Sequence, residues 1–268
     1  MAKLSISQAW DESRAVLAHD GSLLASVALA MIALPQTIGG LAAPRTGIEA
    51  PGYVWAILIV ATLIGLAAQI ALNRLAIGPS TSVGTAVGRG FARMPVLVGT
   101  LLIVIVALFL LLLLIALLLG SVGLTVAPGT GNEPPPGIIL LLILVTVVTF
   151  AIIQLAVPVA AAESGGSLRL IARSWSLGRD EYWRLLAFVT LVLFGLLVVL
   201  AAGQFVFGSF VAVALGAPAP WSLSALVSSL VLALMQAAFT TVSAVMLARI
   251  YVQLAGGAAQ ASVPSSGT

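Results

Sequence analysis

Long apolar stretches without a charged residue are the feature that most constrains the fold of this chain. Residues 96–119, for example, consist mainly of leucine, isoleucine, valine and alanine and contain no charge. A helix needs about 20 consecutive apolar residues to cross a lipid bilayer. Because charged residues make up only 7% of the 268 residues and hydrophobic residues 61%, the sequence predicts an all-α integral membrane protein.

Six transmembrane helices are expected, at about residues 22–41, 52–72, 96–119, 137–160, 185–206 and 221–247. A surface helix is expected before each odd-numbered span, at residues 5–18, 82–94 and 167–184, where charged residues accompany one apolar face. Residues 1–255 then form one membrane domain. The Gly, Ala and Ser content of residues 256–268 predicts a disordered tail.

The lysines and arginines indicate how the spans are oriented. Of the 11 basic residues, all except Arg45 lie on the same side of the six predicted spans. Cytoplasmic loops carry an excess of Lys and Arg, so this side and both termini are predicted to be cytoplasmic. The preference for arginine over lysine, with much alanine, glycine and leucine, is typical of GC-rich bacterial genomes, and a bacterial plasma (inner) membrane is the predicted location.

An internal repeat is the most specific feature of the sequence. Pro51-Gly52 and Pro136-Gly137 are 85 residues apart, and so are Gln69 and Gln154, and Ser82 and Ser167. A third copy is less regular. The repeating unit predicted from these offsets is a surface helix followed by a transmembrane hairpin, used three times. Units that all run in the same direction are related by an axis along the membrane normal.

Short motifs accompany the repeats. A Ser-x-x-x-Ala pattern begins the surface helices at Ser5 and Ser82, the third contains Arg173-Ser174-Trp175-Ser176-Leu177, and the last span ends in Arg249-Ile250-Tyr251. With the six spans, these motifs resemble the glycerophosphoryl diester phosphodiesterase membrane domain family over about residues 5–254. The resemblance implies this membrane topology. Members of that family can also carry a separate catalytic barrel, for which this sequence leaves no segment, so the resemblance does not imply phosphodiesterase activity.

Basic and aromatic side chains on the predicted cytoplasmic side are candidates for contact with lipid headgroups or phosphate. They are Arg89, Arg93, Arg169, Arg173, Trp175, Arg179 and Arg184. Arginine is suited to this role because its planar guanidinium binds phosphate through two hydrogen bonds. Ordinary anchoring at an anionic membrane surface explains the same residues. Glu163, after the fourth span, has two readings as well: an ion or proton site, or a charged helix end paired with a nearby arginine.

Polar side chains form stripes within the predicted spans. Thr62, Gln69 and Asn73 have the spacing i, i+7, i+11, and Ser229, Gln236 and Thr240 repeat it, so each set lies on one helix face. Gln154 is added to this set because it corresponds to Gln69 at the 85-residue offset of the repeat. Such stripes hold membrane helices together by hydrogen bonds; the alternative is a polar path, with Gln69, Asn73, Gln154 and Gln236 lining a cavity between the repeats.

Enzymatic chemistry has little support in the sequence. His19 is the single histidine and there are no cysteines, which excludes a histidine-based triad and a multi-histidine or thiolate metal site within one chain. The carboxylate pairs Asp11-Glu12 and Asp180-Glu181 are adjacent in sequence and point in different directions on a helix. We therefore expect no catalytic residue, no metal and no cofactor.

Three functions follow in order of preference. The first is a non-catalytic scaffold or modulator that engages anionic membrane lipid, or a partner protein, at its cytoplasmic face. The alternative is a transporter or exporter of a lipid-like or amphiphilic molecule. An enzyme acting on lipid headgroups comes last. The basic residues border apolar spans, so lipid rather than nucleic acid is the expected partner.

Overall fold

The computed structural model describes residues 4–42, 51–78, 81–121 and 136–261, and every element within them is helical. In chain order these are α1 (Ile6–Ala28), the π-helical turn η1 (Leu29–Ala33), α2 (Leu34–Ala42), α3 (Gly52–Ile77), α4 (Val83–Ser121), α5 (Pro136–Ile153), α6 (Ala156–Ala162), α7 (Ser167–Gly178), the 3-10 turn η2 (Arg179–Glu181), α8 (Tyr182–Gly203), the π-helical turn η3 (Gln204–Gly208), α9 (Ser209–Leu215) and α10 (Leu223–Ala261).

Proline explains two of the departures from regular α-helix. Pro35 has no backbone N–H to donate four residues back, and the helix widens immediately before it into the π-helical turn η1. Pro158 in the same way leaves the carbonyl of Gln154 without its helical donor, and the chain turns at residues 154–155 between α5 and α6. Irregular backbone at membrane depth is tolerated where protein covers it or where it lines a cavity.

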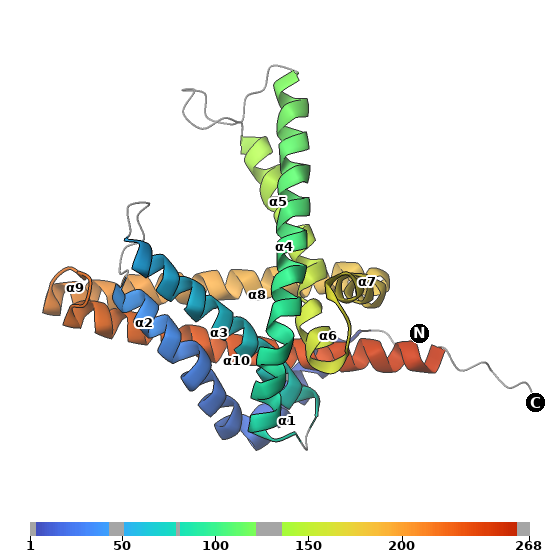
Figure 1. Cartoon of the computed structure of the whole chain (residues 1–268), viewed down its shortest axis with the longest axis horizontal. Helices are drawn as coiled ribbons and strands as arrows, with labels where there is room; N and C mark the ends of the chain where they lie inside the picture. Colours follow the sequence, from blue (N-terminus) through green and yellow to red (C-terminus); the bar gives the residue numbers. More distant parts are fainter. Residues whose placement is uncertain (1–3, 43–50, 79–80, 122–135, 262–268) are drawn as a thin grey trace, which may run out of the picture.

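Small side chains allow α10 to pack closely against α1, α2 and α3. Ala67 and Ala71 of α3 and Ala244 and Ala248 of α10 are buried in one hydrophobic cluster with Leu24 of α1. Membrane helices associate through van der Waals contact, which small residues permit by letting the backbones approach. Figure 1 shows the resulting layer, in which α8 and α10 follow the long axis of the molecule and α2 and α3 lie beside them.

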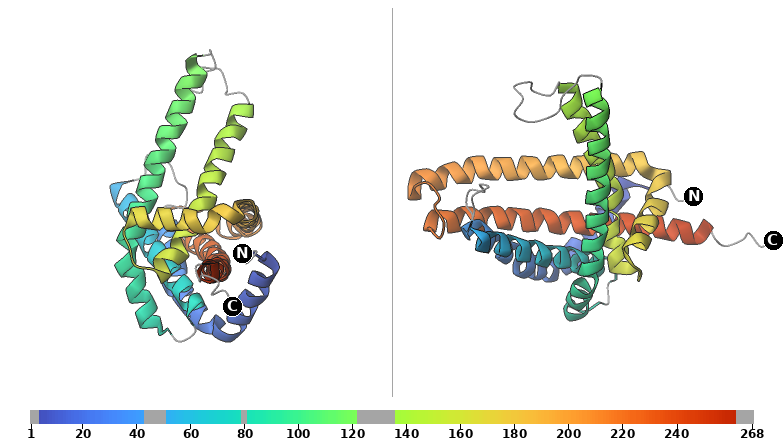
Figure 2. Two further views of the ribbon diagram at one scale, coloured as in Figure 1. Left: turned by 90° about the vertical axis from the view of Figure 1, so that its right-hand side faces the viewer. Right: turned by 45° about the horizontal axis from the view of Figure 1, so that its top comes forward.

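The hairpin of α4 and α5 stands out from this layer, as both views in Figure 2 show. The first turns of α4 pack against α3, with Ala86 and Leu97 fully buried. The apolar stretch that follows is different, because no residue of its most apolar 18-residue window is buried. Leu114 and Leu117, for example, are 53% and 65% exposed. Such a surface is stable against lipid tails and not against water.

Five helices among the described residues are long and apolar enough to cross a membrane. They are Ile6–Ala42, Gly52–Ile77, Val83–Leu118, Ser167–Leu215 and Leu223–Gly256. The predicted all-α class is therefore confirmed, and five spans are supported by length and composition. α7 begins at Ser167, as predicted.

Two expectations about boundaries were wrong. The segments 5–18 and 82–94 are not separate surface helices, because α1 and α4 run from them into the apolar stretches without interruption, α4 with Pro95 inside it. A helix can continue through a proline when neighbouring groups satisfy the freed carbonyl. The predicted disordered tail is helical as far as Ala261, the end of α10; residues 262–268 lie outside the described part of the chain.

Candidate functional site

A cavity of about 220 Å³ lies between α3, α8, α10 and the turn that joins α5 to α6. Its lining includes all four side chains expected to share a cavity: Gln69, Asn73, Gln154 and Gln236. Thr240 and Ser243 add hydroxyl groups. The remaining wall is apolar and includes Phe188, Val192, Leu193, Leu196 and Phe239. We call this space the inner cavity. One part of its wall carries groups able to form hydrogen bonds, and the other part is hydrocarbon.

Helix geometry brings the polar groups together. Gln69 and Asn73 are four residues apart on α3, and Gln236, Thr240 and Ser243 follow the spacing i, i+4, i+7 on α10, so each set shares one face. Gln154 lies at the break before α6. Helix breaks near the middle of the membrane are a common way for transporters to present backbone and side-chain polar groups to a substrate.

Asn73 has an unused hydrogen-bond acceptor in this setting. The side chain is only 1% exposed, and its Nδ2 donates to the carbonyl of Gln69 at 2.9 Å. Its Oδ1 is buried and has no partner among the described residues. A buried polar atom left without a partner costs about 1–3 kcal/mol. The inner cavity is therefore suited to a ligand that donates a hydrogen bond.

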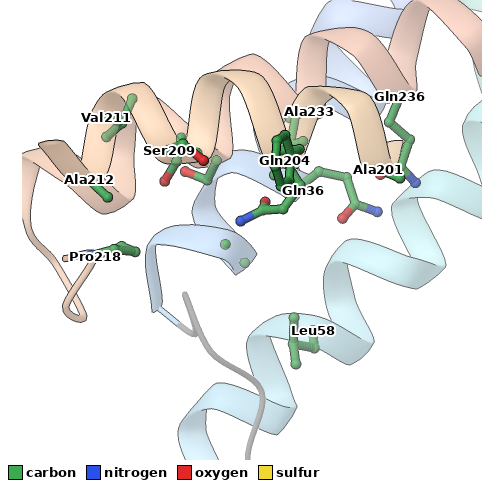
Figure 3. A pocket seen from close by; sticks show the side chains of 17 residues that line it. Gln36, Leu58, Ala201, Gln204, Ser209, Val211, Ala212, Pro218, Ala233 and Gln236 are labelled. Carbon is green, nitrogen blue, oxygen red and sulfur yellow. The ribbon is translucent and has the colours of Figure 1, made fainter. Parts of the chain in front are cut away.

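A second, larger cavity of about 820 Å³ adjoins the first and is called the outer cavity here. Figure 3 shows its walls, formed by α2, α3, α10 and the segment from α8 to α9, with Gln36, Gln204 and Gln236 among the side chains. Gln204 and Gly208 belong to the π-helical turn η3, a feature that often occurs at functional positions. Gln236 lines both cavities, so hydrogen-bonding groups continue from one to the other.

The predicted stripes are only partly correct. Ser229 is nearly buried and lines the outer cavity, and Thr240 lines the inner one. Thr62 is exposed, lines neither cavity, and donates its hydroxyl to the carbonyl of Leu58 within its own helix. The spacing places Thr62 on the same face of α3 as Gln69 and Asn73. At Thr62, however, this face is exposed.

The predicted cytoplasmic end of the molecule is held together around Glu163. Arg89 donates to the carbonyls of Ala161, Ala162 and Glu163 at 2.7, 3.1 and 3.3 Å, and Arg93 donates to the carbonyl of Glu163 at 3.1 Å. The last carbonyls of a helix have no partner within it, so these two arginines close the end of α6 from α4.

The carboxylate of Glu163 makes a further connection. Its Oε1 accepts hydrogen bonds from Arg173 Nε at 2.9 Å and from the Tyr251 hydroxyl at 3.0 Å. Of the two readings of Glu163, the structure supports the helix end paired with an arginine. α4, α6, α7 and α10 all meet at this residue.

Two of the four remaining candidate lipid contacts are also bonded within the protein. Arg184 donates to the carbonyl of Leu4 at 2.9 Å and pairs with Glu181 at 3.1 Å. Arg179 pairs with Asp180 at 3.4 Å. Arg169 is exposed and Trp175 is 51% exposed, so these two remain available to lipid. The predicted set therefore divides into residues that join helices and residues that face outwards.

The described part of the chain shows no cluster of metal ligands. No three His, Cys, Asp or Glu residues within it are grouped in a way that could hold a metal ion. The imidazole of His19 lies 3.9 Å from Asp20, and its side chain is 87% exposed.

Comparison with protein families shows where the chain belongs. The model of a domain of unknown function, DUF7847, matches residues 4–254. The chain belongs to the DUF7847 family. No curated protein and no solved structure matches it. The match does not test the resemblance to the glycerophosphoryl diester phosphodiesterase membrane domain family, which stays a prediction.

Several residues of this DUF7847 domain were missed as site residues by the sequence reasoning. Arg249 donates to the carbonyl of Ala76 at the end of α3 at 2.8 Å, and Tyr251 binds Glu163. Both belong to the Arg249-Ile250-Tyr251 motif, which was used only to suggest a family. Gln36 and Gln204 line the outer cavity. They are long polar side chains within apolar segments, and this signal alone marks them as candidates.

Proposed function

We propose that this protein binds a lipid-like, amphiphilic molecule within the membrane and carries it across, as a transporter or exporter. The observation that supports this function best is the inner cavity, where side chains from α3, α8, α10 and the α5–α6 turn combine a hydrogen-bonding wall with an apolar one. An amphiphile needs both kinds of wall. The continuation into the outer cavity through Gln236 supplies a route along α10.

The chemistry of the walls favours an uncharged polar group on this molecule. No described residue that lines either cavity is charged. An ionised group there lacks a counter-ion, and desolvation of an unpaired ion costs several kcal/mol. Amide and hydroxyl side chains instead suit hydroxyl or amide groups. The volume of about 820 Å³ for the outer cavity is within the range of about 300–1,000 Å³ usual for small-molecule sites.

The scaffold function preferred from the sequence is now less well supported. It relied on the arginines of the third predicted surface helix being available to lipid or to a partner, whereas Arg173 and Arg184 donate to groups of this protein. Arg169 and Trp175 are consistent with anchoring at a membrane surface. An enzyme of lipid headgroups remains the least supported function.

The proposed topology has six spans in three units of the same direction, with both termini in the cytoplasm of a bacterium. The similar packing of the first helices supports the repeat. Ser5 and Ser82 accept hydrogen bonds from the N–H groups of residues 8 and 85, and the alanines four residues on, Ala9 and Ala86, are fully buried. For all six to share a bilayer, the α4–α5 hairpin must turn towards the other helices at Pro95 and at the α5–α6 break.

Cysteine labelling tests this topology, since the chain has no native cysteine. Ser176→Cys, on the exposed face of α7, is expected to react with an impermeant maleimide only after the membrane is opened. Ala217→Cys, at the exposed turn before α10, is expected to react in intact spheroplasts. The reverse pattern contradicts the proposed orientation, and reaction of both from one side contradicts the span between them.

Native mass spectrometry in mild detergent tests the cavity. The wild-type protein is expected to retain an amphiphile, and Asn73→Leu is expected to reduce its occupancy about three- to tenfold, because one hydrogen bond contributes about 0.5–1.5 kcal/mol. The variant is expected to fold, since leucine removes a buried acceptor that has no partner among the described residues.

The matched control for this test is Thr62→Val on the same helix, which alters an exposed polar group outside both cavities. Its occupancy is expected to equal that of the wild type. Equal occupancy in the Asn73 variant, or wild-type protein without any bound amphiphile, contradicts the proposed function.

A further inference from the structure

Arg74 is a half-buried arginine without a partner. It lies in the last turn of α3, one residue after the cavity-lining Asn73. Its guanidinium forms no hydrogen bond or ion pair with any residue that the structure describes, and its Nε is buried. A charge that is partly removed from water without a counter-charge is destabilising. A bound anion would therefore stabilise the guanidinium of Arg74 in this position.

Two further arginines stand close to it. Arg89 of α4 is near enough to Arg74 and Arg93 for the charges of both to act on it. Arg93, like Arg74, has a buried Nε without a partner. The hydrogen bonds that Arg89 and Arg93 do form go to backbone carbonyls of residues 161–163, which accept them without neutralising their charge.

The carboxylate of Glu163 does not form an ion pair with any of these three arginines. Glu163 Oε1 is bound to Arg173 and to the Tyr251 hydroxyl. The described ion pairs of the chain include none of Arg74, Arg89 and Arg93. Arg89 thus lies within electrostatic range of two like charges where α3 and α4 pack together, and like charges disfavour one another.

We propose that Arg74, Arg89 and Arg93 bind a phosphate group at this end of the molecule. Arginine forks bind phosphate oxygens through paired, charge-assisted hydrogen bonds. A phosphate supplies several acceptor oxygens, enough for the unused nitrogens of Arg74 and Arg93 together. The phosphate belongs either to the headgroup of an anionic phospholipid or to a free phosphate compound. This site is separate from the two cavities, whose described linings are uncharged, and does not depend on the proposed transport.

Arg74 is the residue on which to test the site. Arg89 and Arg93 also close the end of α6, so their loss weakens the fold as well. Arg74→Gln removes a charge without removing a hydrogen bond seen in the structure. Arg14→Gln is the matched control, because Arg14 is exposed on α1, carries the same charge and lies on the same predicted side of the membrane. Arg74→Lys, which keeps the charge, serves as a second variant that is expected to fold.

The experiment follows thermal unfolding of the full chain in neutral detergent with two probes, each at constant ionic strength. One is inorganic phosphate, with chloride as its reference; the other is phosphatidylglycerol in the micelles, with phosphatidylcholine as its reference. Wild-type protein and Arg14→Gln are expected to be stabilised by at least one probe. Arg74→Gln is expected to require about tenfold more of that probe for the same shift, and Arg74→Lys an intermediate amount.

Stabilisation by phosphatidylglycerol alone identifies a lipid headgroup site, and stabilisation by inorganic phosphate identifies a site for free phosphate. Two results overturn the proposal. In one, neither probe shifts the unfolding of the wild type relative to its reference. In the other, Arg74→Gln and Arg74→Lys respond to the probe as strongly as Arg14→Gln.

Discussion

Gly90→Ala is expected to disrupt the contact between α3 and α4 and to lower the free energy of unfolding by about 3 kcal/mol or more. A Cβ at position 90 meets the carbonyl oxygen and carbon of Ala67, which are backbone atoms of α3, and lies close to the Cβ of Ala71. Backbone within a helix cannot move aside as the end of a flexible side chain can. Thermal unfolding in detergent measures the effect.

Gly88→Ala is the matched control, two residues away on the same helix. A Cβ there meets nothing within 4 Å, and alanine is favoured over glycine in helices by about 1 kcal/mol. The control is therefore expected to leave the protein unchanged or slightly more stable. If both substitutions destabilise equally, the approach of α3 and α4 at Gly90 does not decide the outcome, and the close packing described there is wrong.

Glu163→Gln is expected to cost about 2 kcal/mol of stability at neutral pH. The substitution removes the negative charge that accepts hydrogen bonds from Arg173 and Tyr251, and a hydrogen bond to a charged group contributes about 1.5–3 kcal/mol. Partial exposure of the pair, 38% for Arg173 and 28% for Glu163, moderates the effect through solvent screening.

The control for Glu163 is Asp180→Asn. Asp180 pairs with Arg179, but both side chains are well exposed, at 63% and 65%, and such pairs contribute about 0–1 kcal/mol. Chemical denaturation of both variants in the same detergent makes the comparison. A Glu163 variant as stable as the Asp180 variant shows that the junction of α4, α6, α7 and α10 does not depend on this carboxylate.

Most of the inner cavity could be predicted because helix periodicity is local. Residues four apart must share a face, so Gln69 with Asn73, and Gln236 with Thr240, were paired correctly without knowledge of the fold. The 85-residue offset added Gln154. What periodicity cannot supply is the extent of the neighbouring helix, and so Thr62 was included although its end of the stripe is exposed.

The roles of the arginines could not be predicted for a related reason. Their position beside the spans is visible in the sequence, but their partners are set by tertiary structure. Arg89 binds carbonyls of residues 161–163, more than seventy positions away. Backbone carbonyls are present at every residue and leave no signal in a sequence. Arg74 was overlooked because a single arginine at the end of a span has the ordinary explanation of membrane anchoring.

The predicted helix boundaries were wrong where polarity changes within one helix. Charge and amphipathicity separated residues 82–94 from the apolar stretch after them, and Pro95 marked a plausible break. Hydrogen bonding nevertheless continues through α4. Composition indicates whether a segment lies at the membrane interface or in lipid. The continuity of a helix depends instead on backbone hydrogen bonds, which form in both environments.

We expect selection to act differently on the two halves of α4. Near Gly90 an added atom meets the backbone of α3, so few substitutions should be tolerated there. In the most apolar window no residue is buried, and leucine, isoleucine, valine and phenylalanine are nearly interchangeable against lipid. We therefore expect the second half of α4 to vary in identity among related chains while it keeps its length and apolar character. The small residues where α3 and α4 touch are expected to vary least.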